Sequence, residues 1–207
     1  MRFLVAAALL PAILFAENSA AGEDRPPTAT VAEYRPLSSR ERLDFYWNRN
    51  FLGPGAYFAS AGRSIGDQFN DQPPEWGQGM EGYSKRLASN FAAFSIQTAT
   101  ESAGAALLGQ DPRYIALREE GGWRRLGHAL SSSVLTYDRR GRRVLAPARV
   151  AGPYAGAFST LAWFPSRFGP KDALRDGTQR LMVGALTNVA REFWPEIRGL
   201  FGGKRER

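Results

Sequence analysis

The chain has 207 residues, a net charge of +7, one histidine and no cysteine. The missing cysteine excludes thiol catalysis, thiolate metal sites and a lipid attached to an N-terminal cysteine, and His128 alone cannot form a metal site made only of histidines. We expect no metal and no cofactor. The hydrophobic fraction of 43% is enough for one domain with its own core.

The first residues are typical of an export signal. Arg2 precedes an uncharged apolar run from Phe3 to Ala16, and residues 19–21 are the small ones at which a signal peptidase cuts. The run is shorter than the ~20 residues of a bilayer-spanning helix. We therefore predict a signal peptide over residues 1–21 and an exported protein. The alternative is an N-terminal anchor that is not cleaved.

Residues 22–37 are polar, rich in proline and without a hydrophobic period, which predicts a flexible leader. Ser38 and Glu41 then form a capping box, the pattern of a helix start. Apolar side chains at helical spacing predict two helices, the second from Tyr57 to Phe69, with a break at Gly53-Pro54-Gly55.

A turn-rich segment, PPEWGQGMEGY at 73–83, leads into a helix of about 26 residues that begins at Tyr83. The rest of the chain predicts a short helix at 112–120 capped by Asp111, a helix at 123–133, a hairpin at 133–147, a helix from Ala148 to Trp163, and a last helix from Leu174 that ends at Trp194-Pro195.

These patterns predict a mainly α fold. It is a single bundle of about six helices over residues 38–198, with one short β-hairpin and a basic tail at 199–207. Small residues recur at intervals of four, as in Gly152 and Gly156, and such rows let helices approach closely.

No stretch after residue 21 is typical of an isolated transmembrane span. The longest uncharged run, Val150–Ser166, has 17 residues and contains two prolines, and the segment 87–110 carries Glu101. We favour a water-soluble or peripheral bundle. A protein partly embedded in the envelope is the alternative.

Glu75 and Glu81 are candidates for acid–base chemistry. They flank Trp76 in the turn-rich segment, and glycosidases use two carboxylates held several ångströms apart. Trp76 with Tyr83 is also a candidate for gripping a sugar ring or a peptide. The structural alternative, which we favour, is a corner in which Trp76 plugs the top of the bundle.

Glu101 and His128 are two further catalytic candidates. Glu101 lies on the apolar side of the long helix, where a carboxylate requires a basic partner such as Arg113 or Arg124. His128 is followed by serines at 131–133, without the glycine-flanked serine typical of a nucleophile. We favour structural roles for both.

The segment DRRGRR at 138–143 is the strongest electrostatic feature. Arg139, Arg140, Arg142 and Arg143 surround one glycine and form a compact basic tip. Such a tip could dock on the phosphates of lipid or lipopolysaccharide, and a solvated turn is the alternative. Anionic lipid or polysaccharide is therefore the expected partner class, and export argues against nucleic acid.

Several motifs together are similar to those of an uncharacterised family of exported bacterial proteins. They are PPEWGQGMEGYSKRLAS, QDPRYIAL with WRRLGHALS, and EFWPEI, all within residues 38–198. The resemblance implies a helical protein of the bacterial periplasm or cell envelope. It implies no activity, ligand or catalytic residue.

We therefore expect a non-enzymatic, exported helical protein that associates with the envelope. One alternative is a periplasmic hydrolase acting on glycan or lipid, with Glu75, Glu81, Glu101 or His128 as acid–base groups. Another is a carbohydrate- or peptide-binding module that uses the Trp76 loop.

Overall fold

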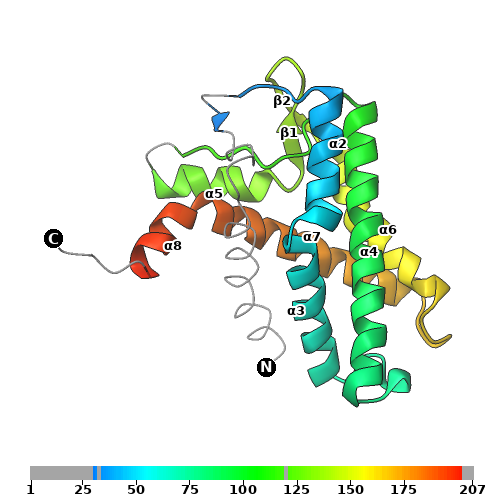
Figure 1. Cartoon of the computed structure of the whole chain (residues 1–207). Coiled ribbons are helices and arrows are strands. Elements are labelled where there is room, and N and C mark those ends of the chain that lie inside the picture. Colours follow the sequence, from blue (N-terminus) through cyan, green and yellow to red (C-terminus); the bar gives the residue numbers. More distant parts are fainter. Residues whose placement is uncertain (1–29, 32–33, 119–120, 202–207) are drawn as a thin grey trace.

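The computed structural model describes residues 30–31, 34–118 and 121–201 (Figure 1). The predicted signal peptide, the first part of the predicted leader and the end of the predicted tail lie outside these residues. The described helices are α2 (Ser39–Trp47), α3 (Gly55–Phe69), α4 (Gly79–Leu107), α5 (Gly122–Ser131), α6 (Pro147–Ser159), α7 (Pro170–Glu192) and α8 (Trp194–Phe201).

The mainly α class with one short hairpin is confirmed. Strand β1 (Leu135–Tyr137) pairs antiparallel with β2 (Arg143–Leu145), and Thr136 lies opposite Val144. Shorter turns connect the helices: a π-helical turn at Asn48–Leu52, and 3-10 turns at Pro74–Trp76 and Thr160–Ala162.

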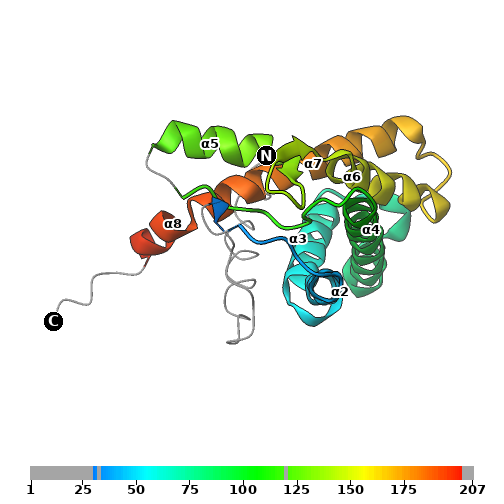
Figure 2. The same ribbon diagram turned by 90° about the horizontal axis from the view of Figure 1, so that it is seen from above.

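Helix α4 is the axis of the fold. It packs against α3 and against α6, α6 packs against α7, and α7 packs against α5. Seen from above, α2, α3 and α4 form one group, with α5, α6 and α7 in a second layer beside them (Figure 2). The hairpin and the C-terminal end of α4 lie at the same end of the bundle (Figure 1).

The helix start predicted at Ser38 is confirmed. The Ser38 hydroxyl accepts a hydrogen bond from the Glu41 backbone N–H, and the Glu41 carboxylate accepts one from the Ser38 N–H at 2.8 Å. The two bonds satisfy donors that a helix start leaves without partners.

The glycines of α6 permit close contact with α4. A Cβ on Gly152 would lie 2.5 Å from Cγ of Glu101, and one on Gly156 would lie 2.5 Å from the carbonyl oxygen of Ala93. Gly177 of α7 similarly accepts the ring of Tyr154. The predicted row of small residues thus brings two helix backbones together.

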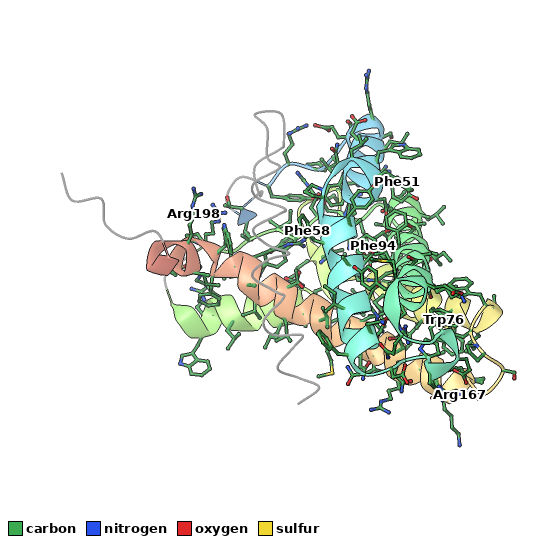
Figure 3. The ribbon with its side chains drawn as sticks, turned by 60° about the horizontal axis from the view of Figure 1, so that its bottom comes forward. Phe51, Phe58, Trp76, Phe94, Arg167 and Arg198 are labelled. Carbon is green, nitrogen blue, oxygen red and sulfur yellow. The ribbon has the colours of Figure 1, made fainter. Side chains whose placement is uncertain are left out.

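Several polar and charged side chains are buried in the interior, and many large apolar side chains are exposed. In the described residues, Arg86, Glu192, Asn50, Thr98 and Asp111 are among the largest fully buried side chains, whereas most buried apolar residues are alanines. Figure 3 shows Phe58 on the outer side of α3 and Phe94 between α3 and α4. Exposed large apolar residues include Leu43, Trp47, Leu52, Phe58, Ile65, Phe69, Leu107, Leu108, Trp123, Leu145, Leu174, Met182, Val183 and Leu186.

The prediction of a short helix at 112–120 is wrong. Residues 111–118 are not helical, and Ala116 instead bridges Thr30 in the manner of a parallel strand. Side chains from distant helices bind this segment's backbone groups, so it does not need helical hydrogen bonds.

Two boundaries also differ from the prediction. The last long helix ends at Glu192, and Trp194 and Pro195 begin α8, because proline is tolerated in a first turn. Part of the predicted flexible leader makes specific contacts: the Val31 N–H donates to the Ala116 carbonyl, the Tyr34 hydroxyl to the Asp138 carbonyl, and Leu37 is buried.

Candidate functional site

Glu75 and Glu81 lie on the surface, and each binds its own basic partner. The Glu75 carboxylate accepts from Arg167 at 2.5 Å, and Glu81 accepts from Lys85 one turn along α4 at 2.7 Å. These hydrogen bonds lower the pKa of both carboxyls. A raised pKa is what a general acid at neutral pH requires, so the shift is in the opposite direction.

Glu101 forms an ion pair, as predicted, but with a different arginine. Its carboxylate lies 2.9 Å from Arg49 and accepts from Gln97 at 3.0 Å. Arg49 belongs to the π-helical turn between α2 and α3, which sequence spacing could not place next to Glu101. Gly152 on α6 provides the room for the carboxylate.

His128 is buried in α5 and supports the extended segment. Its Nε2 lies 2.8 Å from the Ile115 carbonyl, and its ring meets that of Tyr114 edge to face. The neighbouring hydroxyls of Ser131 and Ser132 donate to backbone carbonyls of α5 rather than to the imidazole. The arrangement stabilises the segment and provides no nucleophile.

The four acid–base candidates are not brought together. Glu75 and Glu81 have separate surface partners, Glu101 contacts Arg49 at the α4–α6 interface, and His128 faces Ile115. In the described part of the chain a shallow hollow lies elsewhere, lined by Leu107, Leu108, Gly109, Asp138, Arg139 and Arg140. None of the four candidates lines it.

A buried arginine binds the backbone of the Trp76 loop, residues 72–77. Arg86 of α4 donates to the carbonyls of Gln72 and Pro73 at 2.8 Å and of Gly77 at 2.7 Å. A Cβ on Gly82 would collide with that last carbonyl at 2.2 Å, so the loop folds tightly onto the helix. The segment therefore forms a corner fixed by a guanidinium fork.

Trp76 itself is half-buried. Its ring packs edge to face on Phe164, with centroids 5.1 Å apart, and Phe164 packs in turn on Phe168. Figure 3 shows Trp76 and Arg167 at the same end of the molecule. Among the described residues no ring contact joins Trp76 to Tyr83, so the two do not form one aromatic platform.

A second buried arginine binds the extended segment. Arg149 of α6 donates to the carbonyls of Ser132 at 2.6 Å, Leu135 at 3.0 Å, Asp111 at 3.2 Å and Arg113. Burial lowers the pKa of the Arg149 guanidinium to about 10, so it stays charged at neutral pH. The backbone carbonyls of this irregular region thus accept hydrogen bonds from a side chain instead of from a neighbouring strand.

Glu192 at the end of α7 fixes the other half of that segment. Its buried carboxylate accepts from the Tyr114 hydroxyl and from the N–H groups of Leu117 at 3.0 Å and Arg118 at 2.8 Å. Arg125 of α5 adds an ion pair. Burial alone would raise the pKa of this carboxyl, but the hydrogen bonds outweigh it and hold the pKa below its usual range.

A third polar cluster joins α3, α4 and α7. Asp176 binds Arg63 and Arg180, and Asn90 of α4 donates to Asp67 at 2.9 Å. Burial raises the pKa of Asp67, whereas the two arginines overcome the effect of burial on Asp176 and lower its pKa. The cluster contributes specific packing, as the other two do.

The four arginines of the hairpin tip are not equivalent. Arg142 binds Asp138 at 2.8 Å, and Arg143 donates to the Ser131 hydroxyl at 2.5 Å. Within the described chain, the guanidinium groups of Arg139 and Arg140 have no hydrogen bond or ion pair, and both side chains are exposed.

The described residues include no group of three or more histidine, aspartate or glutamate side chains that could hold a metal. None of the described helices combines the length and apolarity needed to cross a membrane. Comparison with protein-family models, with curated proteins and with solved structures gave no match.

The sequence analysis did not identify the buried arginines that fix the loops, nor the two leucines that line the hollow beside the hairpin. The arginines Arg86 and Arg149 carry no pattern that distinguishes them from exposed arginines. Leu107 and Leu108 carry a clearer signal, because they directly precede Gly109 at the end of α4, and both are exposed. Their exposure marks a surface that the hairpin arginines share.

Proposed function

We propose that this chain is a non-enzymatic, exported helical protein of the bacterial cell envelope, which attaches to envelope components through apolar and basic surface side chains. The observation that carries the proposal is the placement of polar groups inside and large apolar groups outside. Contiguous exposed apolar surface marks sites of contact with a membrane or another protein.

Some of the exposed apolar side chains recur along single helices. On α3, Phe58, Ile65 and Phe69 recur at intervals of seven and four, which places them on one face. On α7, Met182, Val183 and Leu186 are likewise exposed. A protein that functioned free in solution would gain nothing from such faces, since they favour aggregation.

The state of the candidate acid–base groups supports a non-enzymatic role. Glu75, Glu81 and Glu101 each have a nearby cation, and His128 is engaged by a backbone carbonyl. A hydrolase would need at least two of these groups to face one cleft. The resemblance to exported bacterial proteins supports the location.

Fractionation of cells that express the tagged full chain tests the proposal. Isolated envelopes are washed in parallel with high salt, alkaline carbonate and detergent. We expect most of the protein in the envelope fraction and its release by detergent, with at most partial release by salt. Recovery in the soluble fraction at low salt would overturn the proposal.

A variant with Phe58, Ile65 and Phe69 changed to serine isolates the apolar contribution. These side chains are exposed, and we expect the variant to move towards the salt-released fraction. Thermal unfolding of the variant checks that the fold is retained. A matched variant with Ser39, Ser84 and Gln179 changed to alanine alters three exposed neutral positions and should fractionate like the wild type.

A further inference from the structure

The C-terminal end of α4 and the tip of the hairpin form one amphipathic surface. Leu107 is 86% exposed and Leu108 is 53% exposed, and both line the shallow hollow together with Arg139 and Arg140. The Arg139 side chain lies over Gly109, 3.5 Å from the position of a Cβ there. The hairpin and the C-terminal end of α4 lie at the same end of the bundle (Figure 1), and their apolar and basic side chains line the same hollow.

The geometry of the turn keeps two of its arginines free. The Asp138 carboxylate accepts from the N–H groups of Arg140 and Arg142 and from the Arg142 guanidinium. These bonds hold the pKa of Asp138 below its usual range and occupy its oxygens. In the described chain Arg139 and Arg140 therefore have no acidic partner, although they lie beside a carboxylate.

The turn is also firmly built, so the arginines are presented in a defined place. Gly141 adopts a φ of 73°, which favours glycine, and its N–H donates to the Asp138 carbonyl at 3.0 Å. The Tyr34 hydroxyl donates to the same carbonyl, and the Gln110–Asp138 bridge ties the turn to the end of α4.

We propose that this end of the bundle docks on an anionic phospholipid bilayer, with Arg139 and Arg140 bound to lipid phosphates and Leu107 and Leu108 inserted among the acyl chains beneath them. The inference rests on the proposed envelope function and names the surface and its partner. Arginine and phosphate complement each other in charge and geometry.

The leucines distinguish a bilayer from other anions. An acidic polysaccharide or free phosphate satisfies the arginines but offers no apolar medium for Leu107 and Leu108. A bilayer offers both within the few ångströms that separate its headgroups from its acyl region. Leu43 in α2, whose neighbour Arg42 binds the Gln110 carbonyl at 2.5 Å, adds a further exposed apolar side chain near this end.

Sedimentation with lipid vesicles tests the inference, with the protein purified from the cells that express it. The probes are vesicles of phosphatidylcholine alone and vesicles that also contain phosphatidylglycerol. We expect the wild type to prefer the anionic vesicles. The double change R139A/R140A should lower partitioning into them about 25-fold, from about fivefold for each arginine near an anionic surface.

The change L107S/L108S should weaken binding to both kinds of vesicle, because it removes the inserted groups. The matched control is K171A/R175A, which removes two exposed charges from the first turns of α7, away from the hairpin (Figure 1). It should change partitioning less than twofold. Unchanged thermal unfolding of each variant confirms that the fold is retained.

Equal losses from R139A/R140A and K171A/R175A would overturn this docking surface, while the proposed envelope function would stand if the wild type still fractionates with envelopes. Binding to dextran sulfate as strong as to vesicles, and unaffected by L107S/L108S, would identify a polysaccharide partner and also overturn the inference. A wild type absent from the envelope fraction would overturn the proposed function itself.

Discussion

Gly156 of α6 lies directly against the backbone of Ala93 in α4, so close that a Cβ on the glycine would be 2.5 Å from the alanine carbonyl oxygen. No larger residue fits without moving one helix away from the other. Since α4 and α6 form the central contact of the bundle, Gly156 is, with Gly152, one of the positions that set their separation.

The change Gly156→Ala should therefore lower the free energy of unfolding, by about 1–3 kcal/mol for an overpacked interface. Urea denaturation measures it. The control is Gly184→Ala in α7, where a Cβ would have no neighbour within 4 Å. There alanine should raise the stability by about 0.4–1 kcal/mol. A Gly156→Ala protein as stable as the Gly184→Ala protein would contradict the close contact.

Arg86 supports the Trp76 loop through three backbone carbonyls, of which that of Pro73 is buried. The change Arg86→Met preserves much of the side-chain volume but leaves these acceptors without donors, at about 1–3 kcal/mol for each unsatisfied group. We expect a loss of about 3 kcal/mol or more in urea denaturation. Limited proteolysis should also cleave residues 71–79 faster.

The same change at Arg175, which is exposed on α7, is the control and should stay within about 0.5 kcal/mol of the wild type. If Arg86→Met and Arg175→Met unfold at the same urea concentration, the loop does not depend on the guanidinium.

Glu192 should make stability depend on pH. Its folded pKa is lowered, so its contribution is present above the unfolded pKa of about 4.3 and disappears as the pH falls through the lower folded value. The change Glu192→Gln should lower the free energy of unfolding by about 2 kcal/mol at pH 7, from weaker hydrogen bonds. The gap between the two proteins should narrow below about pH 4. A gap that is constant from pH 7 to pH 3 would contradict this.

Asp67 and Asp176 belong to one cluster but have opposite pKa shifts. Because the pKa of Asp67 is raised in the folded state, its contribution to the free energy of unfolding is present below the unfolded pKa and is lost as the pH rises through the folded pKa. The ionised form of Asp67 therefore opposes folding at pH 7. Asp67→Asn should be no less stable than the wild type at pH 7. Asp176→Asn removes the partner of Arg63 and Arg180 and should lose about 3 kcal/mol. Thermal unfolding that ranks them in the reverse order would contradict the assignment.

Local signals predicted most of the helices because their causes are local. The capping box at Ser38 and Glu41, the apolar spacing of α4 and the glycine turn of the hairpin all operate within a few residues. The extended segment at 111–118 could not be predicted in this way. Its backbone partners, Arg149 and Glu192, follow it by more than thirty residues.

The candidate site was predictable only in part. The basic hairpin tip is evident from the sequence, but the turn geometry decides which arginines are free. Likewise, an ion pair for Glu101 follows from its apolar surroundings, while the choice of Arg49 depends on how the π-helical turn lies across α4.

The alanine-rich interior has a thermal consequence. Unfolding a domain normally exposes a large apolar surface to water, and this exposure makes the heat-capacity change of unfolding large and positive. In this protein many large apolar side chains are already exposed in the folded chain, and the buried residues are mostly alanines together with polar and a few charged side chains. The free energy of unfolding should therefore vary less steeply with temperature. Cooling should weaken this protein less than it weakens a domain of the same length whose core consists of large apolar side chains.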